Sequence, residues 1–85
     1  MDIDFSNLDK EEIDKFYKNL SMNIKSLRNE KKITQLDLAL EIGIKSVAFY
    51  SNCENNRYDK HFNLEHLCKL SKALEIDICR FFQEH

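Results

Sequence analysis

The sequence predicts an all-α fold, and three observations support this prediction. The 85 residues include no proline and a single glycine, so few positions break a helix. Apolar residues recur at intervals of three and four along most of the chain, as they do on one face of an α-helix. Gly43 stands between two such runs, where a glycine in the left-handed conformation would end one helix and turn the chain into the next. We therefore expect a compact bundle of five helices.

The first helix is predicted to begin at about Asp9. Its apolar positions are Ile13, Phe16, Leu20, Ile24 and Leu27. This run forms one helix, or two nearly collinear helices if it is broken near Ser21, which would make six in all. Residues 1–8 have no sustained periodicity and are interpreted as a loosely docked tail. We assign residues 1–19 to an acidic N-terminal extension, helical from about residue 9, and residues 20–85 to the main domain.

The second and third helices flank Gly43. Thr34 is a predicted N-cap, with Asp37 three residues later as in a capping box. The apolar spacing of the second helix is carried by Leu36, Ala39, Leu40 and Ile42. Ser46 is the predicted N-cap of the third helix, in which Val47, Tyr50 and Cys53 recur every three residues. Helix, sharp turn and helix is the expected motif.

A polar segment, residues 55–61, is predicted to be a loop before two more helices. Asn63 can cap the fourth helix, whose broad apolar face is formed by Leu64, Leu67, Cys68, Leu70, Ser71 and Leu74. Asp77 can cap a short last helix with Ile78, Phe81 and Phe82 on its apolar side. These last residues either pack inward or form a dimer surface.

The formal net charge is −2 and is unevenly distributed. Residues 1–20 carry six acidic and three basic side chains. Residues 21–62 carry five acidic and seven basic side chains, and residues 63–85 carry four acidic and three basic ones. Only the middle segment is net basic, which is a weak electrostatic footprint for binding phosphates.

Composition also limits the classes of function. Three cysteines without a Cys-x-x-Cys pair, in a chain without an apolar signal segment after Met1, lead us to expect a cytoplasmic protein. No apolar run approaches the roughly 18 residues that span a bilayer.

The cysteines and histidines match no zinc spacing, so Cys68 is interpreted as a core residue and no metal or cofactor is predicted. No nucleophile lies beside a base and no glycine-rich loop is present, so we predict no enzyme.

Many of these positions together form one pattern over roughly residues 20–82. It consists of Ile24-Lys25-Ser26-Leu27-Arg28, Ile33-Thr34-Gln35, Leu38-Ala39, Ile42-Gly43-Ile44, Glu54-Asn55, Leu64, Leu67, Leu70, Ala73-Leu74-Glu75-Ile76 and Phe81-Phe82. The pattern resembles the phage-repressor-like (Xre, Cro/cI) helix-turn-helix family. This resemblance implies a five-helix, lambda-repressor-like DNA-binding fold, with a recognition helix from Ser46 to about Cys53.

The resemblance also implies roles for single residues. Gln35 would hold a DNA phosphate and buttress the recognition helix, and Arg28 would form a structural salt bridge with Glu54. The chain departs from the family pattern in two places. It has one residue more between Gly43 and Glu54, which we place at Ile44-Lys45, and Asn56 stands where the family has glycine.

The positions that would face a DNA groove have little hydrogen-bonding capacity. Base readout is assigned to Val47, Ala48, Ser51 and Asn52. Phosphate contacts are assigned to Gln35, Thr34, Lys45, Ser46, Arg57 and Lys60, with Lys31 and Lys32 nearby.

The predicted function is sequence-specific binding of duplex DNA by a repressor-like transcriptional regulator. Half-sites one helical turn apart would require a homodimer, formed either through Ile78, Phe81 and Phe82 or through the N-terminal helix. The alternative is a protein-interaction module on the same fold, an antitoxin or an adaptor with weak or lost DNA readout. The acidic balance and the apolar Val47-Ala48 pair favour this alternative.

Overall fold

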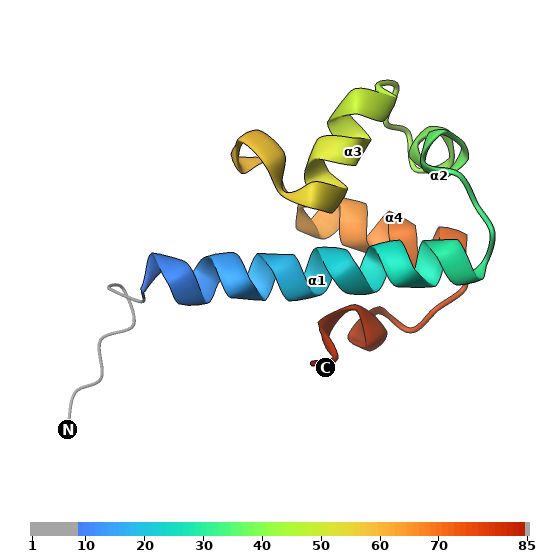
Figure 1. Ribbon diagram of the computed structural model, residues 1–85. Coiled ribbons are helices and arrows are strands. Elements are labelled where there is room, and N and C mark those ends of the chain that lie inside the picture. Colours follow the sequence, from blue (N-terminus) through green and yellow to red (C-terminus); the bar gives the residue numbers. More distant parts are fainter. Residues whose placement is uncertain (1–8, 85) are drawn as a thin grey trace.

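The computed structural model describes residues 9–84, which form four α-helices and two short 3-10 helices without a strand (Figure 1). The elements are α1 (Lys10–Glu30), α2 (Gln35–Glu41), α3 (Val47–Asn55), η1 (Arg57–Asp59), α4 (Leu64–Leu74) and η2 (Ile78–Phe82). The all-α class is confirmed, but the count of five or six helices is not. The first helix runs unbroken past Ser21, and the last segment is a 3-10 helix. The predicted tail, residues 1–8, lies outside the described residues.

Five of the six described helices begin at a residue whose side chain caps the first turn. A side-chain oxygen accepts a hydrogen bond from a backbone N–H of the first turn at Asp9, Thr34, Ser46, Asn63 and Asp77. The predicted caps at Thr34, Ser46, Asn63 and Asp77 are therefore confirmed. At Asn63 the capping is reciprocal, because Nδ1 of His66 accepts the Asn63 backbone N–H at 3.0 Å.

The turns at the ends of α2 and α3 use the left-handed conformation. Gly43 has φ of +84°, and Asn56 has φ of +53°, so asparagine replaces glycine there without loss of the turn. In Figure 1, α2 is viewed nearly along its axis whereas α3 lies across the view. The bend at Gly43 therefore sets the two helices at a steep angle.

The long helix α1 is the centre of the packing. Helix α3 packs against one side of α1 and η2 against the other, while α4 lies behind them (Figure 1). The largest fully buried side chains come from α1, α2, α3, α4 and η2 and are Tyr50, Phe81, Ile24, Leu38, Leu70, Leu74 and Cys53. The core thus forms where the C-terminal half of α1 passes between the other elements.

Several apolar residues that the helical spacing placed on apolar faces are exposed. Leu36 and Leu40 are 49% and 58% exposed, because the short helix α2 turns Leu38 and Ala39 inward instead. Leu64, at the first position of α4, is 82% exposed, and Cys68 is also exposed, so its interpretation as a core residue was wrong. These side chains fit the helical period but lie at the edge of the buried stripe.

The two C-terminal phenylalanines differ. Phe81 is fully buried, so its assignment to a dimer surface was wrong. Phe82 is 40% exposed and its ring lies 6.1 Å from the ring of Phe16 on α1. The side-chain amide of Asn23 donates to the backbone carbonyls of Phe81 (2.9 Å) and Gln83 (2.7 Å), which holds η2 against α1.

Candidate nucleic-acid interface

The inward face of α3 is anchored through one carboxylate, that of Glu54. Arg28 on α1 donates to both of its oxygens, from Nε to Oε2 and from Nη2 to Oε1, each at 3.0 Å. Tyr50, one turn earlier on α3, donates its hydroxyl to Oε2 at 2.7 Å. Gln35 on α2 donates from Nε2 to Oε1 at 3.1 Å. Three helices therefore converge on the Glu54 side chain, which is fully buried.

The pKa values of this cluster follow from burial and from these bonds. Burial alone would raise the pKa of Glu54, but the hydrogen bonds from Arg28, Tyr50 and Gln35 outweigh it, and the pKa lies below its ordinary value. Burial, together with the neighbouring Glu54 charge, raises the pKa of Tyr50 well above the ordinary tyrosine value. The carboxylate is thus ionised and the phenol protonated at neutral pH.

The Arg28–Glu54 pair expected from the resemblance is present, and so is the contact by which Gln35 buttresses α3. Arg28 also donates from Nη1 to the backbone carbonyl of Ile33 at 2.7 Å, which fixes the connection between α1 and α2. Sequence reasoning missed the part played by Tyr50. Its position four residues before Glu54 on one helix was the available signal, because residues at this spacing are neighbours.

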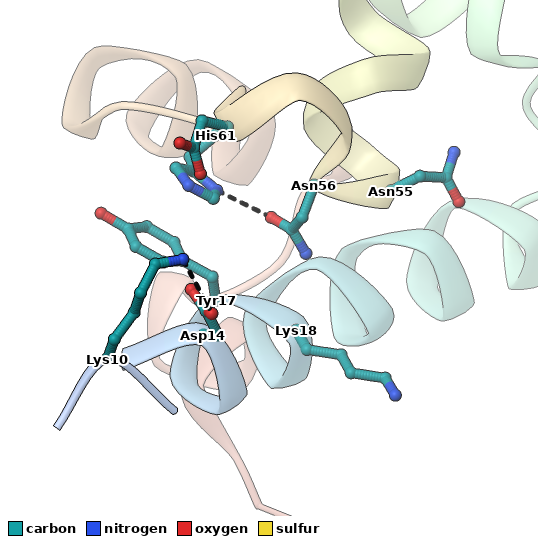
Figure 2. Close-up of a pocket in the computed structure, with 8 residues that line it drawn as sticks. Lys10, Asp14, Tyr17, Lys18, Asn55, Asn56 and His61 are labelled. Carbon is teal, nitrogen blue, oxygen red and sulfur yellow. Dashed lines mark hydrogen bonds and ion pairs between the residues drawn. The ribbon is translucent and has the colours of Figure 1, made fainter. Parts of the chain in front are cut away.

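The C-terminal end of α3 is held by a second set of contacts. Asn56 Oδ1 accepts a hydrogen bond from Oγ of Ser21 at 3.2 Å and lies 2.9 Å from Nδ1 of His61. The His61 ring stacks on Tyr17, with ring centroids 3.7 Å apart. Figure 2 shows this arrangement of Tyr17, His61 and Asn56 along a groove of about 310 Å³ between α1 and the residues after α3. The groove is also lined by Lys10, Asp14, Lys18, Asn55 and Asp59.

The outward face of α3 carries the four residues assigned to base readout. Val47 is 42% exposed, Ala48 is exposed, and Ser51 and Asn52 are partly exposed. Ser51 already accepts hydrogen bonds from the Asn55 amide, at the backbone carbonyl (2.8 Å) and at Oγ (3.4 Å). The structure thus brings the four positions together on a surface that a ligand can reach.

Most of the residues assigned to phosphate contacts are also exposed. They are Thr34, Lys45, Ser46, Arg57 and Lys60, and Lys31 and Lys32 share this exposure. The hydroxyl oxygens of Thr34 and Ser46 accept bonds from their own helices, which leaves each hydroxyl hydrogen able to donate outward. Gln35 is partly buried, and its amide keeps a second N–H beside the one given to Glu54.

The sequence profile of the helix-turn-helix family matches residues 24–81, which are more than half of the chain. The chain belongs to the helix-turn-helix family. The resemblance to phage-repressor-like proteins is thereby confirmed, and membership of this DNA-binding family supports DNA binding by the domain. Comparison with curated proteins and with solved structures gave no significant match.

The helix-turn-helix match begins within α1, so the first half of that helix lies outside it. Between residues 9 and 84, no three His, Cys, Asp or Glu side chains are grouped in a way that could hold a metal ion. In the same part of the chain, no helix has both the length and the apolar character needed to cross a membrane.

Proposed function

We propose that this helix-turn-helix domain binds duplex DNA sequence-specifically by inserting α3 in the major groove, and that it acts in the cytoplasm as a repressor-like, homodimeric transcriptional regulator. One observation carries this proposal. Helix α3 is fixed through its inward face by Glu54, while its outward face is open and has a cation beyond each end, Lys45 and Arg57. A rigid helix with an accessible face between cations suits a groove flanked by phosphates.

The outward face favours A·T base pairs. The Asn52 amide can donate to N7 and accept from N6 of adenine, and the side chains of Val47 and Ala48 can contact the methyl group of thymine. The face carries no arginine or lysine, which are the residues that most often pair with guanine. We therefore expect one polar base contact per subunit, supported by apolar contacts.

Phosphate binding supplies the remaining affinity. The N-termini of α2 and α3 present Thr34 and Ser46, and Lys45, Arg57 and Lys60 lie close by in the chain. Neutralising phosphates releases counterions, so affinity falls steeply as the salt concentration rises.

A salt titration with a labelled duplex of random sequence tests this proposal. We expect saturable binding whose log–log slope against salt concentration is several units. Lys45→Ala and Arg57→Ala should each reduce the slope by about one unit, because each removes about one phosphate contact. Arg80→Ala is the matched control, since Arg80 is exposed on η2, across α1 from α3 (Figure 1). Its slope should equal that of the unmodified chain.

The second candidate function, a protein-interaction module such as an antitoxin or an adaptor, is favoured by the surface of α2. Leu36 and Leu40 are exposed there beside the acidic Asp37 and Glu41. Such a surface suits a protein with apolar and basic side chains better than it suits a phosphate backbone. Absence of saturable DNA binding even at low salt would overturn the DNA proposal and favour this function.

A further inference from the structure

We propose that a second copy of this chain docks on the first half of α1, with the two α1 helices antiparallel, and that this is the dimer interface. The inference deepens the proposed function and rests on it for the spacing on DNA, but the contact itself can be tested without DNA. It concerns residues 10–19, which precede the part of the chain that matches the helix-turn-helix family.

The first half of α1 carries an apolar surface that its own chain covers incompletely. Ile13 is 38% exposed and Phe16 is 56% exposed, although Phe16 packs against Tyr17 and Phe82. Both continue the helical stripe of the buried residues farther along α1, and this end of the helix projects beyond α3 and η2 (Figure 1). A stripe that is buried in one half of a helix and exposed in the other is typical of a helix that has a second partner.

The charges beside this stripe are self-complementary. A groove of about 360 Å³ between α1 and η2 has Phe16 and Phe82 among its lining residues, together with Glu12 and Lys15. Positions 12 and 15 are three residues apart and share one edge of the helix. When two such helices are antiparallel and Ile13 of each faces Phe16 of the other, Glu12 of each lies near Lys15 of the other. The symmetric contact therefore contains two attractive pairs.

This arrangement places both recognition helices on the same side of the dimer. The stripe lies between two sides of α1: Phe16 and Asn23 contact η2 on one side, and Tyr17 and Ser21 contact the residues after α3 on the other. Two antiparallel helices in contact are related by a two-fold axis perpendicular to the plane that contains them. Here that axis points toward the α3 side, so the two α3 helices emerge in the same direction and can meet one face of a duplex.

The distance between the recognition helices also fits DNA. The part of α1 that contacts the end of α3, between Ser21 and Arg28, is centred about ten residues from the midpoint of Ile13 and Phe16, which is about 15 Å along an α-helix. The two-fold axis doubles this to about 30 Å, close to the roughly 34 Å between major grooves one turn apart. The same contact thus explains dimerisation and half-site spacing.

The C-terminal surface is the less suitable site for a second copy. Phe81 is fully buried, and Phe82 already packs against Phe16 of its own chain. Ile78 is 36% exposed, and Phe82, at 40%, is the other large exposed apolar side chain of that segment. Of the exposed charges beside Ile78, Asp77 and Arg80, the Asp77 carboxylate is already used to cap η2, because it accepts the backbone N–H of Cys79 at 2.9 Å.

Sedimentation equilibrium of the full chain without DNA tests the interface. We expect a mass twice that of the 10.2 kDa chain. Glu12→Lys and Lys15→Glu should each raise the dimer dissociation constant about tenfold, because two attractive pairs become repulsive. The double variant Glu12→Lys/Lys15→Glu should restore dimerisation, since it exchanges the charges. Lys25→Glu, an exposed charge reversal on the other half of α1, is the control and should leave the constant unchanged.

Each outcome decides for or against the interface. A monomer at all concentrations, or a dimer that is weakened by Ile78→Ser but not by the single charge reversals, overturns it. A double variant that remains monomeric while circular dichroism shows full helicity also overturns it. If the dimer behaves as expected but no duplex is bound, the interface stands and the proposed DNA function falls. If the chain remains a monomer and still binds a single half-site, the proposed interface falls and the proposed DNA binding stands.

Discussion

The inward and outward faces of α3 differ sharply, although their residues alternate along nine positions of one helix. On the inward side, Tyr50, Arg28 and Gln35 each donate a hydrogen bond to the buried carboxylate of Glu54. On the outward side, Val47 and Ala48 are exposed. The difference teaches that stability and recognition are carried by separate faces. Substitutions on one face should therefore leave the property of the other nearly unchanged.

The largest expected effect comes from breaking the inward face. Arg28→Ala should lower the free energy of unfolding by about 3–5 kcal/mol, because the buried carboxylate of Glu54 loses its cation. Urea denaturation followed by circular dichroism measures this change. Arg80→Ala removes an exposed arginine and should change the stability by less than about 0.5 kcal/mol.

A paired substitution shows whether the isolated charge causes that loss. The double variant Arg28→Met/Glu54→Leu removes both charges and should be more stable than Arg28→Ala alone. If Arg28→Ala unfolds at the same urea concentration as the unmodified chain, the cluster does not hold α3, and the separation of the two faces is wrong.

Lowering the pH should reduce the free energy of unfolding by a smaller amount. The pKa of Glu54 is lower in the folded chain than in the unfolded chain, where it is about 4.3, so ionised Glu54 stabilises the fold. This contribution is present above about pH 4.3 and is lost as the pH falls through the folded-state pKa. Unfolding measured at a series of pH values should therefore show a decline at low pH, and Glu54→Gln should flatten it. Equal declines for both proteins would assign the acid sensitivity to other carboxylates.

The smallest effect on stability should come from the outward face. Asn52→Ala should change the free energy of unfolding by less than about 0.5 kcal/mol, yet alter base preference at one position by about 1–3 kcal/mol. Binding to a panel of duplexes with single base changes measures the preference. Ala48→Ser is a neighbouring control that keeps Asn52. A drop in affinity that is equal for all duplexes would show that Asn52 does not read a base.

Sequence reasoning succeeded where the determinants are local. The caps at Thr34, Ser46 and Asn63 depend on side chains that bond to the next turn, and Gly43 and Asn56 tolerate a positive φ through their own chemistry. Such features need no knowledge of distant residues.

Prediction failed where tertiary contacts decide. In the seven-residue helix α2, Leu36 and Leu40 fit the helical period as well as Leu38 and Ala39 do, and only packing shows which pair is buried. The stack of His61 on Tyr17 joins residues 44 positions apart, and no periodicity reveals it. For the candidate nucleic-acid interface, the Arg28–Glu54 pair was predicted from the family resemblance. The residues alone predicted only a bend between two helices, with cations nearby.

The placement of the three cysteines gives the helix-turn-helix domain two sites for chemical labelling. Cys53 is sealed inside α3, and burial raises the pKa of its thiol, so a maleimide dye should not reach it in the native state. Cys68 on α4 and Cys79 on η2 are exposed, and the Asp77 carboxylate raises the pKa of the Cys79 thiol. A fluorophore can thus be attached first at Cys68, on a helix other than the one that would enter the groove.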